Sequence, residues 1–230
     1  MGINAVVEIK KMNKIFPVAN DEFYALKDIN LTFGVSEFTG IVGPSGSGKT
    51  TLLNIMGSLD KPTSGSVDFM GNNITGFSSK KCAELRKNNI GFIFQTYNLL
   101  PVYSVYENLE LPLILLGMTS SEKRKAIMES LDWVGLTDKK DSKPAHLSGG
   151  QCQRVAIARA MVKQPKLVLA DEPTANLDSK NSHIILKTMK KINEESKTTF
   201  IFSTHDEKVI GYLNRKITLI DGTVQKDEIS

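Results

Sequence analysis

The sequence predicts an α/β fold in which helices cover both faces of a largely parallel sheet. Short apolar runs alternate with amphipathic segments, the pattern of parallel strands joined by helical crossovers. One such run, Phe38–Val42, enters a glycine-rich loop and then an apolar-faced helix. Another, Leu167–Ala170, ends in two acidic residues. Because ligands of α/β proteins bind at the carboxyl ends of the strands, both runs point to a binding site at that edge.

The bulk composition is ordinary for a globular protein and excludes several classes. The 230 residues are 40% hydrophobic and 23% charged, with a net charge of +4 from scattered lysines, so a solvated surface is favoured and no nucleic acid is expected. Cys82 and Cys152 lie far apart and predict neither a disulfide framework nor a zinc site, in keeping with a reducing cytoplasm. Met1–Asn13 lacks an apolar signal core, and no run approaches the ~18 apolar residues of a membrane span.

The N-terminal region predicts an antiparallel sheet beside the main core. Val6–Met12 and Ile29–Phe33 alternate as strands do, and Ser66–Met70 follows a turn at Lys61–Gly65. The segment Asn13–Ala25 between the first two strands lacks a clear period and is expected to be irregular.

The segment Gly43–Thr50 has the sequence Gly-Pro-Ser-Gly-Ser-Gly-Lys-Thr, a phosphate-binding loop between a strand and a helix. Its glycines allow backbone N–H groups to surround phosphate oxygens, and the helix directs its positive dipole end at the same anion. Lys49 supplies a charge to the outer phosphates, and the Thr50 hydroxyl is a ligand for Mg²⁺. ATP with Mg²⁺ is therefore the expected ligand, bound by Gly43, Pro44, Ser45, Gly46, Ser47, Gly48, Lys49, Thr50 and Thr51.

The middle of the chain changes to a mostly helical character. A helix over Ser78–Asn88 leads to a buried strand, Ile90–Phe94, which ends at Gln95. Two further helices follow, Ser104–Leu116 and Glu122–Val134; Thr119 and Glu122 have the spacing of a capping box, and Gly135 suits a helix end. We therefore expect one domain, 1–230, in which a helical subdomain (95–147) is inserted into a nucleotide-binding core with its β-subdomain (1–94 and 148–230).

The α/β pattern then resumes to the end of the chain. Asp221-Gly222 is a strong hairpin signal between two short alternating runs. The expected elements are a helix over Gly150–Val162, a strand over Leu167–Ala170, a helix over Ser179–Glu195, a strand over Thr199–Ser203, and a hairpin of Ile217–Ile220 with Thr223–Lys226.

The acidic ending of the Leu167–Ala170 strand suits phosphate chemistry. Asp171 is placed to hold Mg²⁺ through water, and Glu172 to orient or polarise an attacking water molecule. Taken alone, this ending does not distinguish a catalytic site from a turn, because many strands end in Asp-Glu. Downstream of a phosphate loop, the catalytic interpretation becomes strong.

A second glycine-rich helix start occurs at Leu147–Gln151, Leu-Ser-Gly-Gly-Gln. Ser148 is a natural N-cap, and Gly149 and Gly150 leave backbone N–H groups open to an anion. The alternative interpretation is that this glycine-rich segment only starts a helix and binds no ligand.

Together these motifs resemble the ATP-binding cassette (ABC) ATPase family over nearly the whole chain. The phosphate loop, Gln95, the Leu-Ser-Gly-Gly-Gln signature, the acidic strand, Ala175–Asp178 and His205 occur in the family's order. The segments Ile90–Gly117 and Gln151–Asp178 are most similar to the ATPase subunits of lipoprotein-release and macrolide-export transporters.

The resemblance implies further roles for single residues. Gln95 would sense Mg²⁺ and the attacking water, and His205 would contact the γ-phosphate; with Glu172 they form the expected catalytic set. Phe16 would stack on adenine, although core packing is an equal alternative. Thr50, Gln95 and Asp171 are the expected metal ligands. The signature Ser148, Gly149, Gly150 and Gln151, with Asp178, would contact the nucleotide bound to a second copy of the chain.

The resemblance also implies a cellular location and interaction partners. Two copies would close head to tail around two ATP molecules and drive membrane-spanning permease subunits, at the cytoplasmic face of the cell membrane, in export or in lipoprotein or peptide extraction. The apolar segment Thr96–Tyr103 is the expected docking surface for the permease; packing inside the helical subdomain is the alternative. A soluble ABC-type ATPase of DNA repair or translation, and a regulator without turnover, are the rival functions. The first usually has two cassettes, coiled-coil arms or zinc cysteines, and intact Glu172 and His205 argue against the second.

Overall fold

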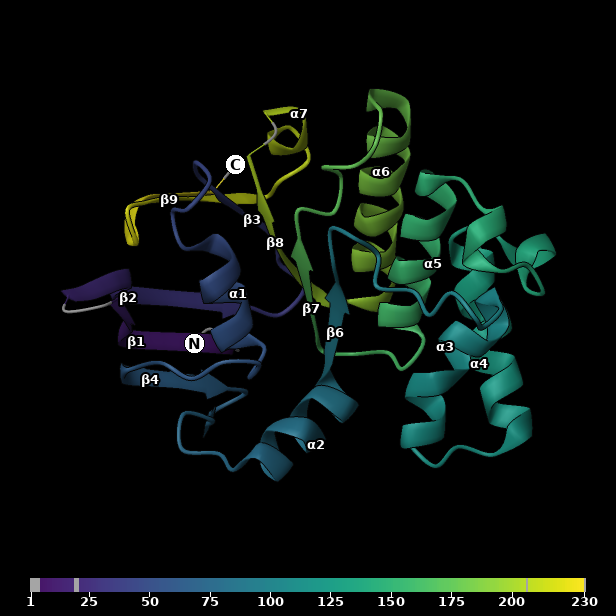
Figure 1. Ribbon diagram of the computed structural model, residues 1–230, viewed down its shortest axis with the longest axis horizontal. Helices are drawn as coiled ribbons and strands as arrows, with labels where there is room; N and C mark the ends of the chain where they lie inside the picture. The colour runs from purple at the N-terminus through teal and green to yellow at the C-terminus, as the bar shows by residue number, and fades with distance from the viewer. Residues whose placement is uncertain (1–4, 19–20, 206, 230) are drawn as a thin grey trace.

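The computed structural model describes residues 5–18, 21–205 and 207–229, which form two sheets and the helices around them (Figure 1). The smaller sheet is antiparallel, with the strand order β2-β1-β4-β5. Its strands are β1 (Ala5–Val18), β2 (Asp21–Gly34), β4 (Ser64–Phe69) and β5 (Asn72–Asn73).

The larger sheet has the order β10-β9-β3-β8-β7-β6, and all its pairings are parallel except the terminal hairpin of β9 with β10. Asp171 pairs with Ser203, and Val42 pairs with Thr204, so three strands end together at one edge. The strands are β3 (Phe38–Val42), β6 (Ile90–Ile93), β7 (Leu167–Asp171), β8 (Thr199–Thr204), β9 (Arg215–Ile220) and β10 (Thr223–Ile229).

The helices divide between two apolar cores. One core lies between the two sheets and contains the apolar face of α1; the other joins the opposite face of the large sheet to α3, α4, α5 and α6 (Figure 1). The helices are α1 (Lys49–Met56), α2 (Ser79–Asn89), α3 (Val105–Leu115), α4 (Ser120–Trp133), α5 (Gly149–Met161), α6 (Ser179–Ser196) and α7 (Glu207–Ile210), with short 3₁₀ turns at Thr137–Lys139 and Pro144–His146. The fold class expected from the sequence is confirmed: a mostly parallel sheet lies beside an antiparallel sheet from the N-terminal region, with α3 and α4 inserted between β6 and α5.

Local sequence signals explain where the helices begin. Thr119 caps α4 and forms the expected capping box with Glu122, and Ser148 caps α5 in the same way with Gln151. Gly135, just beyond α4, has a φ of 64°, the left-handed conformation that ends helices.

The expectation of irregular structure over Asn13–Ala25 is wrong. This segment, apart from residues 19 and 20, continues β1 and β2 into a long hairpin, in which Phe16 pairs with Phe23. The outer half of the hairpin extends beyond the core, so its residues are exposed or half-buried on both faces. Because neither face of this part of the hairpin is buried, apolar and polar residues are not required to alternate along it. The short elements β5 and α7 were also not expected.

Candidate functional site

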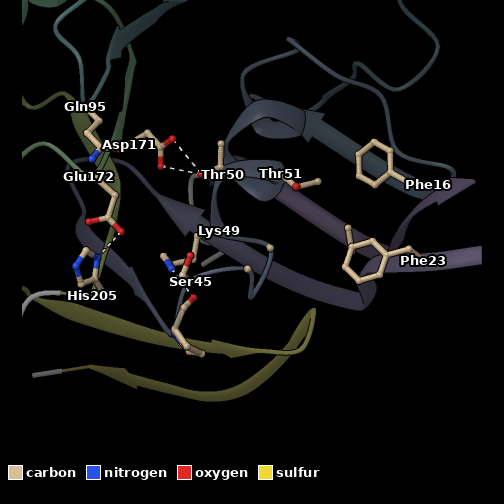
Figure 2. Close-up of a pocket in the computed structure, with 14 residues that line it drawn as sticks. Phe16, Phe23, Ser45, Lys49, Thr50, Thr51, Gln95, Asp171, Glu172 and His205 are labelled. Carbon is tan, nitrogen blue, oxygen red and sulfur yellow. Dashed lines mark hydrogen bonds and ion pairs between the residues drawn. The ribbon is translucent and has the colours of Figure 1, made fainter. Parts of the chain in front are cut away.

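A cleft of about 660 Å³ lies at the carboxyl edge of the large sheet, between that edge and the β1–β2 hairpin (Figure 2). It gathers residues from the phosphate loop, three strand ends and the hairpin. The lining residues are Phe16, Phe23, Ala25, Pro44, Ser45, Gly46, Gly48, Lys49, Thr50, Thr51, Gln95, Asp171, Glu172 and His205.

The phosphate loop has a backbone that only glycine suits at its last turn. Gly48 has a φ of 102°, and a Cβ there would lie 2.5 Å from the Ala25 carbonyl oxygen. Gly48 is also the N-cap of α1 and brings no side-chain cap, so backbone N–H groups in the first turn are open to a ligand. The Lys49 ammonium donates to the carbonyl oxygens of Gly43 and Pro44, both at 2.8 Å. This geometry makes an anion cradle with its charge held inside the loop.

Thr50 faces the acidic strand across the cleft. Its hydroxyl lies 3.1 and 3.0 Å from the two carboxylate oxygens of Asp171 (Figure 2). A hydroxyl, a carboxylate and the nearby Gln95 amide are hard oxygen donors, the type that Mg²⁺ prefers. The described residues include no cluster of three or more His, Cys, Asp or Glu side chains that could hold a metal. An ion here would therefore depend on phosphate oxygens and water for its remaining ligands.

The two acidic residues are positioned by Ser203, which lies fully buried on the neighbouring strand β8. The Ser203 hydroxyl donates to Asp171 at 2.6 Å and accepts the Glu172 backbone N–H at 3.0 Å. Glu172 has a φ of 48°, a strained conformation for a residue other than glycine. One hydroxyl thus fixes the Asp171 carboxylate and the turn that aims Glu172 into the cleft.

Glu172 and His205 meet at the end of the cleft farthest from the hairpin. His205 Nδ1 lies 2.8 Å from Glu172 Oε1, and Glu172 is much more buried than His205 (Figure 2). As expected from the sequence, His205 directly follows a buried strand, β8. The two side chains therefore come from neighbouring strand ends and form one unit.

Gln95 reaches the cleft from a turn that is anchored elsewhere. Tyr97 and Asn98 both have positive φ, and Arg159 of α5 donates to their carbonyl oxygens at 2.8 and 2.6 Å. Burial lowers the pKa of the Arg159 guanidinium. Asn176 donates to the Gln95 carbonyl at 3.0 Å. The turn is thus tied both to α5 and to the loop after the acidic strand.

The opposite end of the cleft is apolar. Phe16 and Phe23 extend from paired positions on β1 and β2, and both rings lie beyond Thr51 (Figure 2). Phe16 is 38% exposed and outside both apolar cores, so the core-packing alternative for this residue is wrong.

The signature residues do not join the cleft of their own chain. Ser148 and Gly149 are exposed at the start of α5, and none of Ser148–Gln151 lines the cleft. Asp178 is also outside it and caps α6, accepting the Asn181 backbone N–H at 2.8 Å. This bond lowers the pKa of the Asp178 carboxyl.

Sequence reasoning missed three residues that shape the site: Phe23, Arg159 and Ser203. Ser203 and Arg159 act through neighbours that are distant along the chain, whereas Phe23 lines the cleft itself. Only the strand pairing of Phe23 with Phe16 could have indicated that Phe23 lies in the cleft, and the hairpin that creates this pairing was not expected.

Comparison with known proteins decides the family. Residues 26–175, which include the phosphate loop and the acidic strand, match the ABC transporter family. The chain belongs to the ABC transporter family. The ATP-binding protein LolD of a lipoprotein-releasing system of Geobacter metallireducens is 42% identical over 225 residues, covering 98% of this chain and 100% of that protein. An ABC transporter ATP-binding protein of Methanocaldococcus jannaschii, MJ0796, is 43% identical and covers 97% of each chain.

Solved structures of ABC ATPases have closely similar folds to this chain. A dimeric, post-hydrolysis structure of MJ0796 bound to ADP and Pi has a TM-score of 0.89 at 43% identity, covering 97% of this chain and 98% of that one. CbiO1 of Clostridium perfringens, part of the transporter complex cbiONQ, has a TM-score of 0.89 at 31% identity, covering 98% and 89%. The expected family is confirmed: the chain is the ATP-binding subunit of an ABC transporter and an ATPase. No helix in the described part of the chain is long and apolar enough to span a membrane.

Proposed function

We propose that this ABC ATPase works as a head-to-tail dimer with Mg²⁺ and ATP, and that it drives a membrane-spanning permease in export or in lipoprotein or peptide extraction. One observation carries the proposal. The cleft holds the phosphate loop and the Glu172–His205 pair, whereas the signature helix start at Ser148 is exposed and outside it. The Ser148 hydroxyl already accepts the Gln151 N–H, so the Gly149 and Gly150 N–H groups are the ones left for an anion, which a nucleotide on a second copy would supply.

The phosphate loop binds and orients the nucleotide. Lys49 and the first turn of α1 place positive charge around the β- and γ-phosphates. Thr50, Asp171 and Gln95 would hold Mg²⁺, and the ion would supply positive charge that offsets the charge of the phosphates. Because Ser203 fixes the Asp171 carboxylate, that ligand is positioned before the nucleotide arrives.

Hydrolysis requires a water molecule in line with the γ-phosphate. Glu172 orients this water and accepts its proton, and His205 holds the Glu172 carboxylate and reaches the γ-phosphate. Gln95 faces the same end of the cleft and senses whether water and ion are in place. The chemistry is mainly positioning and charge stabilisation, as is general for phosphoryl transfer.

The second copy completes each site. Ser148, Gly149, Gly150 and Gln151 would present N–H groups and a hydroxyl to the γ-phosphate bound by the partner, and Asp178 would link the two sites. The relative MJ0796 is dimeric in its structures, one of which contains ADP and Pi, which supports this arrangement.

The permease would dock beside the Gln95 turn, at the inner face of the membrane. Leu100, Val102 and Tyr103 are 41%, 70% and 39% exposed, so these apolar side chains of the Thr96–Tyr103 segment are available to a partner. Arg159, which anchors the start of this segment, also lines a separate apolar groove of about 470 Å³ between α2 and α3. Homology to LolD supports export or extraction. The segment follows Gln95 directly, which provides a short route from the ATP site to the partner.

The concentration dependence of ATP hydrolysis tests this proposal. If each site needs two chains, the rate should rise with the square of protein concentration below the dimer dissociation constant. Ser148→Arg should bind ATP as the wild type does but hydrolyse almost none, because the bulky side chain blocks closure. A rate that is linear in protein at every concentration would show that one chain suffices.

A further inference from the structure

The turn of the β9–β10 hairpin reaches the phosphate loop from outside the cleft. Asp221 and Gly222 form this turn, as the sequence indicated. Gly222 is buried, whereas Asp221 beside it is exposed, and neither residue lines the cleft. Turns usually lie at the surface, so the burial of Gly222 reflects contacts that the turn makes with other segments of the chain.

Gly222 connects two segments that lie far from it along the chain. Its N–H donates to the Ser47 carbonyl oxygen of the phosphate loop at 3.1 Å, and its carbonyl oxygen accepts the Lys27 N–H of β2 at 2.8 Å. The hairpin also touches the first residue of the loop, because a Cβ on Gly43 would lie 2.0 Å from the Leu219 carbonyl oxygen. The hairpin therefore contacts the phosphate loop near both of its ends, and Gly222 ties one of these ends to β2.

The hydrogen bond to Ser47 sets the direction of a neighbouring donor. All described peptide bonds are trans, and in a planar trans peptide unit the C=O and the following N–H point in opposite directions. The Ser47 carbonyl points out of the cleft to Gly222, so the Gly48 N–H points to the other side, toward the cleft that Gly48 lines. Successive N–H groups of this kind form the concave surface that binds a phosphate.

We infer that Gly222 is a positioning residue for nucleotide binding: its N–H holds the Ser47–Gly48 peptide in the orientation that presents the Gly48 N–H to a phosphate group. The inference rests on the proposed phosphate site and deepens it, by adding a residue that lies outside the cleft. A donor that is oriented before the ligand arrives loses less freedom on binding, so the bond to Gly222 contributes to affinity. The Glu172–His205 pair is held by other contacts, so the hydrolytic step does not depend on this bond.

Calorimetric titration with inorganic tripolyphosphate and with Mg²⁺·ATP tests this assignment, together with melting temperatures and steady-state ATPase assays. In Gly222→Ala the new Cβ would lie 2.7 Å from the Ala25 carbonyl oxygen, so the turn must move away from its partners. Both affinities should fall by about 10- to 100-fold, the size of one hydrogen bond to a charged group. KM for ATP should rise, whereas kcat at saturating ATP should change little.

Gly71→Ala is the matched control. Gly71 has the same place in the two-residue turn between β4 and β5, with a φ of 78° against 75° at Gly222. A Cβ on Gly71 would meet no atom of the described chain within 4 Å. The control therefore imposes similar backbone strain away from the loop, so it should lower the melting temperature and leave both affinities unchanged.

A second substitution separates the contact from the strain. Asn tolerates a positive φ better than Ala does but still carries a Cβ. Gly222→Asn should therefore be more stable than Gly222→Ala and still lose affinity for tripolyphosphate and ATP.

Three results would overturn the inference. The first is an unchanged tripolyphosphate affinity in both Gly222 variants. The second is an equal loss of affinity in Gly71→Ala, because destabilisation alone would then explain the effect. The third is a fall in kcat without a change in affinity, which would place the effect at the hydrolytic step. If the wild-type chain bound neither tripolyphosphate nor ATP, the proposed phosphate site itself would be wrong, a failure distinct from these three.

Discussion

Replacing Ser203 with alanine should lower the catalytic rate far more than it lowers ATP affinity. The variant loses the 2.6 Å hydrogen bond to the Asp171 carboxylate and leaves the Glu172 backbone N–H without its acceptor. A hydrogen bond to a charged group contributes about 1.5–3 kcal/mol, and an unsatisfied buried donor costs about 1–3 kcal/mol. When the Glu172 turn relaxes from its φ of 48°, the release of backbone strain offsets about 1–3 kcal/mol of this loss.

The net destabilisation is therefore about 1–3 kcal/mol, which for a chain of this size lowers the melting temperature by roughly 2–4 °C per kcal/mol. The relaxed turn displaces Glu172, and a 1 Å misplacement of a catalytic group costs about 100-fold in rate. Since the phosphate loop is untouched, the dissociation constant for ATP should change little.

Steady-state ATPase assays and calorimetry on the same preparations measure both quantities. Ser203→Thr is the control, because it retains the hydroxyl and should recover most of the rate. A folded Ser203→Ala with wild-type kcat would refute the positioning role. Equal losses in kcat and ATP affinity would also refute it, because they would indicate general damage to the cleft.

Three further substitutions test separate parts of the account. Lys49→Ala should abolish tight binding of Mg²⁺·ATP in calorimetry, because it removes the ammonium that the loop holds; unchanged affinity would exclude this loop as the site. Leu100→Glu should prevent co-purification with the membrane complex while ATP affinity and melting temperature change little; retained co-purification in a folded protein would place the docking surface elsewhere. Asn108→Leu removes the acceptor of the Leu100 N–H and a donor to the Tyr103 carbonyl, whereas the Leu100 and Ser104 carbonyls keep other donors, so it should cost about 1–3 kcal/mol in thermal unfolding. An unchanged melting temperature would contradict that contact.

The sequence predicted the parts of the fold in which at least one face is buried. The strands that became β3, β6, β7 and β8 are short apolar runs. The helices α4 and α5 begin directly after Thr119 and Ser148, the two caps that the sequence indicated, although their predicted first residues were Glu122 and Gly150. The β1–β2 hairpin could not be recognised because its outer half has no buried face to impose a period.

The candidate site was predictable where a motif lies in one stretch of chain. The phosphate loop and the Asp171–Glu172 ending are of this kind. Ser203 and Arg159 are different, because their roles depend on the strand or turn that happens to lie beside them. A serine on a buried strand carries no signal of the acidic residues on the next strand until the pairing of Asp171 with Ser203 is known.

The mass of the Glu172→Gln variant in solution, measured by light scattering, tests most directly the claim that two copies enclose ATP. The amide keeps the shape of the side chain but cannot accept the proton of water, so bound ATP should persist. With ATP and Mg²⁺ the mass should double from the 25.4 kDa of one chain, and with ADP it should not. Adding Ser148→Arg to this variant should abolish the doubling while ATP still binds. A variant that binds ATP, fails to hydrolyse it and remains at 25.4 kDa would contradict the claim.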